Sequence, residues 1–190
     1  MNLLKVVKLS SKDAENLTVL LHRAYQANEV LGIHFKAASV DVKDVRKHLL
    51  SVPTYGYKDE KGKIVSTVSV RLPWSYNAGP FNLPHLGWIT TDPAYQHQGY
   101  GKSIINDVLE QYVKKVLNAP AVTLGTAVEH PWLQETYISL GFTPIEEVRK
   151  FSDHKTVYLI KTFDVSLLEQ VSDEHLQRIL RKQAIKGEKE

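Results

Sequence analysis

The sequence predicts a mixed α/β domain, in which amphipathic helices cover a sheet of short strands. Segments with apolar residues at helical spacing alternate with shorter segments of alternating or continuous apolar residues. A glycine turn, Gly99-Tyr100-Gly101, joins one apolar run to a long helix-period segment. The 190 residues, 43% hydrophobic and 24% charged, suit one globular domain with a substantial core.

The first half of the chain predicts one strand, two helices and two further strands. Residues 3–9 alternate as a strand does, and Ser10 to Asp13 form a variant of a capping box before a helix that starts near Ala14. The later elements are a helix over 42–50, a strand over 54–58, a polar turn over 59–62 and a strand over 64–72.

The second half predicts the remaining strands and helices. A loop over 73–84, rich in Pro, Gly and Asn, precedes a strand over 86–91. The elements that follow are a helix from about Ser103, a strand over 121–127, a helix over 131–140 stopped by Gly141, and strands over 142–151 and 155–163. The predicted order is β-α-α-β-β-β-α-β-α-β-β.

The last residues predict a short helix capped by Ser172. Its apolar stripe consists of Leu176, Ile179 and Leu180, and packs either on the same domain or on a second subunit. Residues 186–190 are expected to be disordered.

Composition excludes several functional classes. The net charge is only +3 and the charges are interspersed, which argues against a nucleic-acid partner. No apolar run approaches the roughly 18 residues of a membrane span, and Lys5 and Lys8 interrupt any signal-peptide core. Because the chain has no cysteine, it has no disulfide, thiolate metal site or cysteine nucleophile. We therefore expect a cytoplasmic protein without a metal.

The glycine turn is typical of a phosphate site, because the first N–H groups of a helix lack intrahelical partners and the helix dipole favours an anion. A nucleotide P-loop would need glycine where the chain has Gln96. A dinucleotide fingerprint would need its third glycine where the chain has Ile104. A third pattern, Gln/Arg-x-x-Gly-x-Gly/Ala, matches Gln96-His97-Gln98-Gly99-Tyr100-Gly101 without a mismatch.

This hexapeptide resembles the pyrophosphate loop of the GCN5-related N-acetyltransferases (GNAT), which bind acetyl-CoA. Pro93 lies a few residues before it, as in that family, and Tyr137-x-x-x-Gly141-Phe142 matches a second family motif. The resemblance covers residues 3–163 and is most specific over 86–142. It implies a GNAT domain over 1–163, a C-terminal extension over 164–190, and a mostly antiparallel sheet splayed between its fourth and fifth strands. Dimers are common in such proteins, so a homodimer is one expected state.

The resemblance also implies the activity, acetyl transfer from acetyl-CoA to a primary amine by direct attack in a ternary complex. In the family, backbone N–H groups of the loop hold the pyrophosphate, and the fourth strand's backbone binds the pantetheine arm and polarises the thioester carbonyl. His130 stands where the family often has Asn. The expected donor-binding residues are Ile89, Thr90, Thr91, Gln96, Gln98, Gly99, Tyr100, Gly101, Lys102, Ser103 and His130.

Two residues are candidates for proton transfer. Tyr137 matches the family tyrosine that protonates the departing sulfur, for which a neutral phenol is suited. Its alternative is a core tyrosine. Histone-acetylating members carry a Glu eleven residues before the motif, and that position here is His85. Histidine is a suitable base near neutral pH. The alternatives are a surface histidine at a strand start, or a water chain in place of a single base.

The acceptor should be recognised by the loop between the first two helices and by the loop before the fourth strand. The candidate substrate-binding residues are Glu29, His34, Phe35, Trp74 and Tyr76, each of which could instead pack only for stability. The sequence leaves the acceptor amine unidentified. It also leaves open a different acyl-CoA, an alcohol acceptor, and a non-catalytic CoA-binding sensor.

Overall fold

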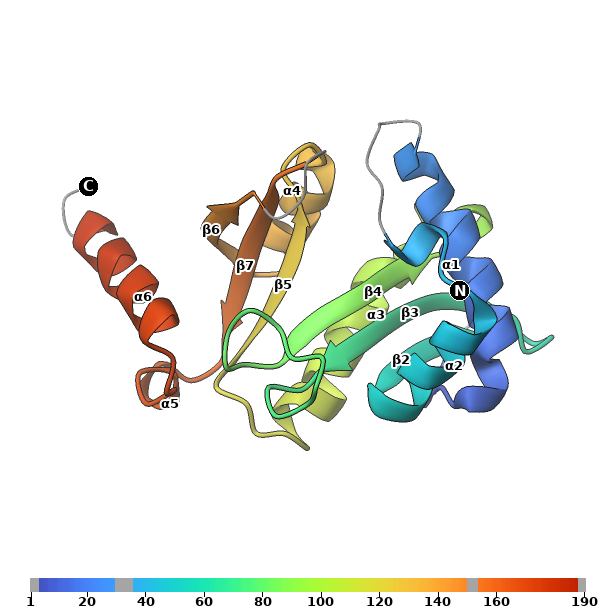
Figure 1. The fold of residues 1–190 in the computed structure, drawn as a ribbon, viewed down its shortest axis with the longest axis horizontal. Helices are drawn as coiled ribbons and strands as arrows, with labels where there is room; N and C mark the ends of the chain where they lie inside the picture. The colour runs from blue at the N-terminus through green and yellow to red at the C-terminus, as the bar shows by residue number, and fades with distance from the viewer. Residues whose placement is uncertain (1–3, 30–35, 150–153, 188–190) are drawn as a thin grey trace. The chain divides into compact units, whose positions relative to one another are not determined.

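The computed structural model describes residues 4–29, 36–149 and 154–187, which form parts of two compact units (Figure 1). The first unit comprises Met1–Val70 and Gly87–Lys115, and the second comprises Arg71–Leu86 and Val116–Glu190. The boundary passes through one strand, β4 (His85–Thr91), whose first two residues belong to the second unit.

Three of the four strands described in the first unit follow the predicted ranges closely, whereas the first strand, predicted over 3–9, is shorter. The four strands are β1 (Val6–Lys8), β2 (Thr54–Lys58), β3 (Ile64–Arg71) and the greater part of β4. β2 pairs antiparallel with both β1 and β3. The predicted turn between β2 and β3 is confirmed, and Gly62 takes a left-handed φ of +78° there.

Helices α1 (Ala14–Glu29) and α2 (Val42–Ser51) share a core with β3, and Figure 1 shows α2 in front of these strands and α3 behind them. The Ser10 N–H donates to the Asp13 carboxylate at 2.8 Å, one half of the predicted capping box. Helix α3 (Tyr100–Val108) begins three residues earlier than predicted, because left-handed Gly99 caps it. It continues as a π-helical turn over Leu109–Lys114.

The second unit contains β5 (Ala121–Ala127), β6 (Thr143–Val148) and β7 (Thr156–Thr162), with β7 antiparallel to both neighbours. Helix α4 (Pro131–Ser139) packs on β5 and β6. It stops at Gly141, whose φ of +87° confirms the predicted helix end.

Seven strands in the described part of the chain are hydrogen-bonded in the order β1-β2-β3-β4-β5-β7-β6. β4 and β5 are parallel, and their ladder consists of His85↔Thr123 and Leu86↔Leu124. The predicted mixed and mostly antiparallel sheet with flanking helices is therefore confirmed. The described β4–β5 ladder covers only the first two residues of β4.

The C-terminal segment differs from its prediction in three ways. A short helix, α5 (Val165–Leu168), was not predicted, and α6 (Glu174–Gly187) is capped by Asp173 instead of Ser172. The predicted disorder over 186–190 is wrong for residues 186 and 187, which end α6.

The apolar stripe of α6 packs on its own unit. Leu176 is fully buried in a cluster with Phe81 and Tyr158, and Ile179 and Leu180 pack against the same cluster. Across the described residues, no helix is both long enough and apolar enough to cross a membrane.

Candidate functional site

The glycine turn has the geometry of an anion site. Gly99 has φ +84° and is the N-cap of α3, and its carbonyl accepts the first helical hydrogen bond from the Ser103 N–H at 3.0 Å. The first turn of the helix carries no acidic residue, and residues 96–99 are exposed. Because N–H groups at the start of a helix point along its axis, the turn presents donors and a positive dipole end to an anion.

The two glycines serve different purposes. A Cβ on Gly99 would meet no atom within 4 Å, so glycine is needed there only because the backbone is left-handed. A Cβ on Gly101 would lie 3.1 Å from Thr91 Oγ1, so glycine is needed there because a larger residue would crowd Thr91. Gly101 therefore permits a close approach between the start of α3 and the end of β4.

Alanine at each glycine should give distinguishable effects. We expect Gly99→Ala to lower the free energy of unfolding by about 1–2 kcal/mol, because alanine is strained in the left-handed backbone. This loss should be the same whether or not Thr91→Ala is also present, because the strain is confined to residue 99. The loss caused by Gly101→Ala should shrink when Thr91→Ala is added, because the crowding atom is then gone. Urea unfolding of the single and double variants tests this. Additive effects for Gly101 and Thr91 would contradict the steric explanation.

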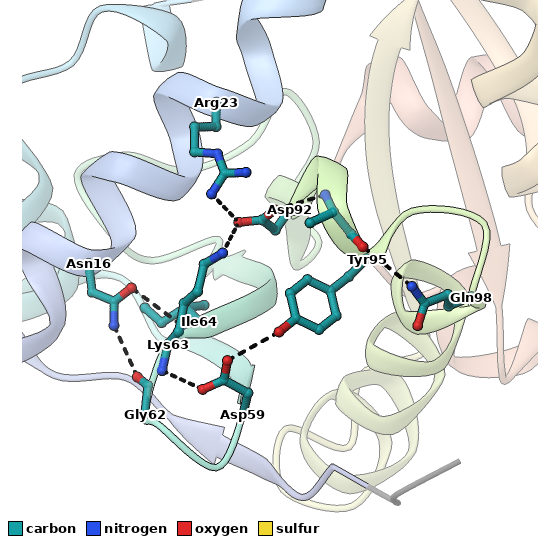
Figure 2. Close-up of polar contacts among 10 residues, drawn as sticks. Asn16, Arg23, Asp59, Gly62, Lys63, Ile64, Asp92, Tyr95 and Gln98 are labelled. Carbon is teal, nitrogen blue, oxygen red and sulfur yellow. Dashed lines mark hydrogen bonds and ion pairs between the residues drawn. The ribbon is translucent and has the colours of Figure 1, made fainter.

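A buried carboxylate holds the start of the glycine turn in place (Figure 2). Asp92 is fully buried, and its Oδ2 lies 3.0 Å from Arg23 Nη1 and 2.9 Å from Lys63 Nζ. Its Oδ1 accepts the Ala94 N–H at 2.9 Å and so caps the 3-10 helix Pro93–Tyr95. Burial alone would raise the pKa of Asp92, but the hydrogen bonds and the two cations outweigh it and lower the pKa.

A second carboxylate ties the β2–β3 turn to the same segment. Asp59 Oδ1 accepts the N–H groups of Lys61 and Lys63, both at 2.9 Å, and Asp59 Oδ2 accepts the Tyr95 hydroxyl at 3.2 Å (Figure 2). Asn16 on α1 donates to the Gly62 carbonyl at 3.0 Å.

This network was not predicted from the sequence. The available signal was Asp92 directly before Pro93, a pair that often starts a turn. Its two cations come from distant segments, which no sequence pattern connected.

His85 is buried in the second unit, so its interpretation as a surface histidine is wrong. Its Nδ1 lies 2.8 Å from Thr123 Oγ1 on β5, and its ring meets the Tyr158 ring edge-on at 6.0 Å. A Cβ on Gly79 would lie 2.5 Å from the His85 Cβ, so the preceding loop packs directly on the histidine.

Tyr137 and His130 lie on α4 and at its N-cap, respectively, and both are buried. The Tyr137 ring meets Phe142 edge-on at 6.3 Å, and its carbonyl accepts the Phe142 N–H at 3.1 Å. The Tyr137-x-x-x-Gly141-Phe142 motif therefore forms one packed helix end. Burial lowers the pKa of His130 and favours its neutral form.

The loop before β4 exposes two of the predicted acceptor contacts. Trp74 and Tyr76 are 72% and 73% exposed. The Arg71 guanidinium braces this loop by donating to the carbonyls of Asn77 and Ala78, both at 2.6 Å. His34, Phe35 and the Glu29 side chain lie outside the described residues.

The candidate residues divide between the units. The donor-binding candidates lie in the first unit except His130, whereas His85 and Tyr137 lie in the second. Among the described residues, no cluster of three or more His, Asp or Glu is placed to hold a metal ion.

The family model described as "Acetyltransferase (GNAT) family" matches residues 19–142, which include the glycine turn, β4 and the Tyr137 motif. This chain belongs to the GNAT family. S-(2-succino)cysteine N-acetyltransferase of Bacillus subtilis (strain 168) is 37% identical over 150 residues, covering 79% of this chain and 90% of that protein. S-alkylcysteine N-acetyltransferase of the same strain is 31% identical over 163 residues, covering 83% and 90%.

The fold of this acetyltransferase is also similar to that of PaiA N-acetyltransferase from Thermoplasma acidophilum, solved in complex with coenzyme A. The TM-score is 0.66 at 16% identity, covering 84% of this chain and 99% of that one. The named relatives are N-acetyltransferases, so the predicted activity, acetyl transfer to an amine, is confirmed.

Proposed function

We propose that this acetyltransferase transfers the acetyl group of acetyl-CoA to the α-amine of an S-substituted cysteine. The observation that carries the acceptor class is the pair of Bacillus subtilis relatives, whose names share an S-substituted cysteine as acceptor. The free α-amine is the nucleophile that N-acetylation requires. The cytoplasmic location and the homodimer stay predictions.

The glycine turn is the proposed pyrophosphate site. It fits a diphosphate because exposed residues 96–99 lead into a helix start that carries no acidic residue in its first turn. The nearby Asp92 does not repel the anion, because Lys63 and Arg23 neutralise it. Ile89, Thr90 and Thr91 are the proposed pantetheine contacts, and Gly101 brings Thr91 close to the turn.

The reaction needs one base and one acid. The ammonium of the acceptor first loses one proton to the base, which passes it to solvent. The neutral nitrogen then attacks the thioester carbonyl, and a C–N bond replaces the C–S bond. The sulfur leaves with the electron pair and takes a proton from the Tyr137 hydroxyl, and the second proton, lost by the nitrogen as the amide forms, restores the tyrosine. His85 is the proposed base, through water, because its ring is buried on β4 and held at Nδ1 by Thr123.

The base assignment predicts a change in the pH profile. His85→Gln should remove the limb of the kcat/KM profile that rises with pH as the base loses its proton. Thr123→Val is the matched control. It removes the hydroxyl partner of His85 but leaves the imidazole in place, so the rising limb should remain. An unaltered profile for His85→Gln would assign proton removal to a water chain.

The acceptor panel tests the function itself. Release of free CoA should be fastest with S-(2-succino)cysteine or an S-alkylcysteine, and slower with spermidine, free alanine and an N-terminal alanine peptide. We propose that Trp74 and Tyr76 contact the S-substituent, so Trp74→Ala should raise KM for S-benzylcysteine more than for S-methylcysteine. A preference for spermidine or for the peptide would overturn the acceptor class.

Binding and turnover measured together distinguish an enzyme from a non-catalytic sensor. Acetyl-CoA at 100 times its dissociation constant should stabilise the fold by about 2.7 kcal/mol. Strong stabilisation without CoA release from any acceptor would favour a non-catalytic CoA-binding module. Comparing the turnover with acetyl-, propionyl- and succinyl-CoA identifies the preferred acyl donor.

A further inference from the structure

Trp88 has an unusual backbone for a strand residue. Its φ is +44°, in the left-handed region, although it lies in the middle of β4. Among the described residues, His97 and Asn118 are the other non-glycine residues with positive φ, and neither lies in a strand. A bulky residue keeps such a conformation only where its surroundings enforce it, and such strain concentrates at functional sites.

Buried hydroxyls from β3 hold the main chain of β4 at this point. Thr67 Oγ1 donates to the Trp88 carbonyl at 3.0 Å and lies 2.9 Å from Thr90 Oγ1. Ser66 Oγ donates to the Thr90 carbonyl at 2.8 Å. Thr67 and Ser66 are fully buried, so water does not compete for these bonds.

The Trp88 side chain is held as well. Its ring stacks on His48 of α2, with centroids 3.7 Å apart and planes 19° apart. His48 Nε2 in turn lies 3.0 Å from Ser69 Oγ on β3. The strained residue is therefore fixed at its carbonyl by Thr67 and at its ring by His48.

The Trp88 carbonyl and the Ile89 N–H belong to the same planar peptide group, in which the two bonds point in opposite directions. A hydrogen bond that fixes the carbonyl therefore fixes the direction of the N–H. Ile89 is one of the residues proposed above to contact the donor, and its side chain is only partly buried.

We propose that Thr67 is a positioning residue for acetyl transfer. By binding the Trp88 carbonyl, its hydroxyl aims the Ile89 N–H at the thioester carbonyl of the donor and so strengthens the polarisation of that carbonyl. This inference rests on the proposed function, because it requires acetyl-CoA to lie along β4.

The test uses two threonines with the same local chemistry. Thr54 is also buried, also donates to a main-chain carbonyl (Val52, 3.0 Å) and also pairs with a second hydroxyl (Ser69, 2.9 Å). It reaches Trp88 only indirectly, through Ser69 and His48, so Thr54→Val leaves the bond to the Trp88 carbonyl in place. Thr67→Val and Thr54→Val each leave one main-chain carbonyl without its hydroxyl partner. Thr67→Ser restores the bond at the first position.

The primary readout needs no acceptor. Acetyl-CoA labelled with 13C at the acetyl carbonyl is bound to each protein, and its carbonyl resonance is compared with that of the free donor. We expect a downfield shift on binding to the wild type, Thr54→Val and Thr67→Ser, and a smaller shift on binding to Thr67→Val. The donor's dissociation constant should stay within about threefold in all four proteins.

The second readout is turnover with the acceptor that the panel selects. Thr67→Val should lower kcat on the order of tenfold to a hundredfold with little change in KM, as expected for a misaligned oxyanion donor. Thr54→Val and Thr67→Ser should stay close to wild type. Equal losses in Thr67→Val and Thr54→Val, or an unchanged 13C shift in Thr67→Val, would overturn the inference. Failure of the wild type to acetylate any S-substituted cysteine would instead overturn the acceptor class.

Discussion

Tyr137→Phe should lower kcat on the order of a hundredfold with acetyl-CoA as donor, while the dissociation constant for acetyl-CoA stays nearly the same. The physical reason is that a thiolate is a poorer leaving group without a proton donor, and a positioned general acid typically contributes at least this factor. Phenylalanine keeps the ring that packs on Phe142, so the helix end should remain intact. Stopped-flow CoA release and isothermal titration give the two constants.

A change of donor separates the acid role from a structural one. p-Nitrophenyl acetate loses a phenolate that needs no proton, so Tyr137→Phe should be nearly as active as wild type with this donor. Tyr112→Phe, which removes a hydroxyl on the π-helical turn, is the control for the loss of a partly buried tyrosine hydroxyl. Equal losses with both donors would show that Tyr137 supports the fold and does not protonate the sulfur.

Asp92→Asn should lower the free energy of unfolding by about 2 kcal/mol, the contribution typical of hydrogen bonds to a charged group. Asparagine keeps an oxygen for the Ala94 N–H, so the variant isolates the contacts with Arg23 and Lys63. Their side chains are 43% and 38% exposed, and solvent screening keeps the effect below that of a fully buried pair. Acetyl-CoA should also bind more weakly, because the start of the glycine turn loses its anchor.

The pH dependence gives an independent check on Asp92. The pKa of Asp92 is lowered in the folded protein. Its contribution to the free energy of unfolding is therefore complete above the ordinary carboxyl pKa of about 4, and is lost as the pH falls through the lower pKa of the folded state. The stability difference between wild type and Asp92→Asn should therefore be constant at neutral pH and shrink below about pH 4. Asp41→Asn is the control, since Asp41 caps α2 through the Asp44 N–H at 2.7 Å. A difference that stays constant into acid would mean that the carboxylate charge contributes nothing.

Much of the fold followed from local patterns. β2 and β5 have the predicted bounds, because their apolar residues lie between clear turn residues. The start of α3 was placed three residues too late, because its first turn contains a glycine and a lysine and carries no apolar periodicity. The cap of α6 was assigned to Ser172 instead of Asp173, since adjacent residues of similar capping preference cannot be ranked by type alone.

The candidate site was only partly predictable. The glycine turn could be identified because left-handed backbone and close helix–strand packing both require glycine at defined positions, Gly99 and Gly101. The burial of His85 could not, because it depends on Gly79 and Tyr158 from other segments. Exposure of Trp74 and Tyr76 likewise depends on which loop aromatics enter the core, and Phe81 is the one buried there.

The family and the position of the glycine turn could be predicted from the sequence, because both depend on residue types at short spacings along the chain. Only the tertiary structure revealed what holds that turn and the neighbouring strand. Asp92 meets Arg23 and Lys63, and Thr67 meets the strained Trp88, across separations of tens of residues. Such contacts leave no periodic signal, because they are set by the pairing of strands and the packing of α1 on them.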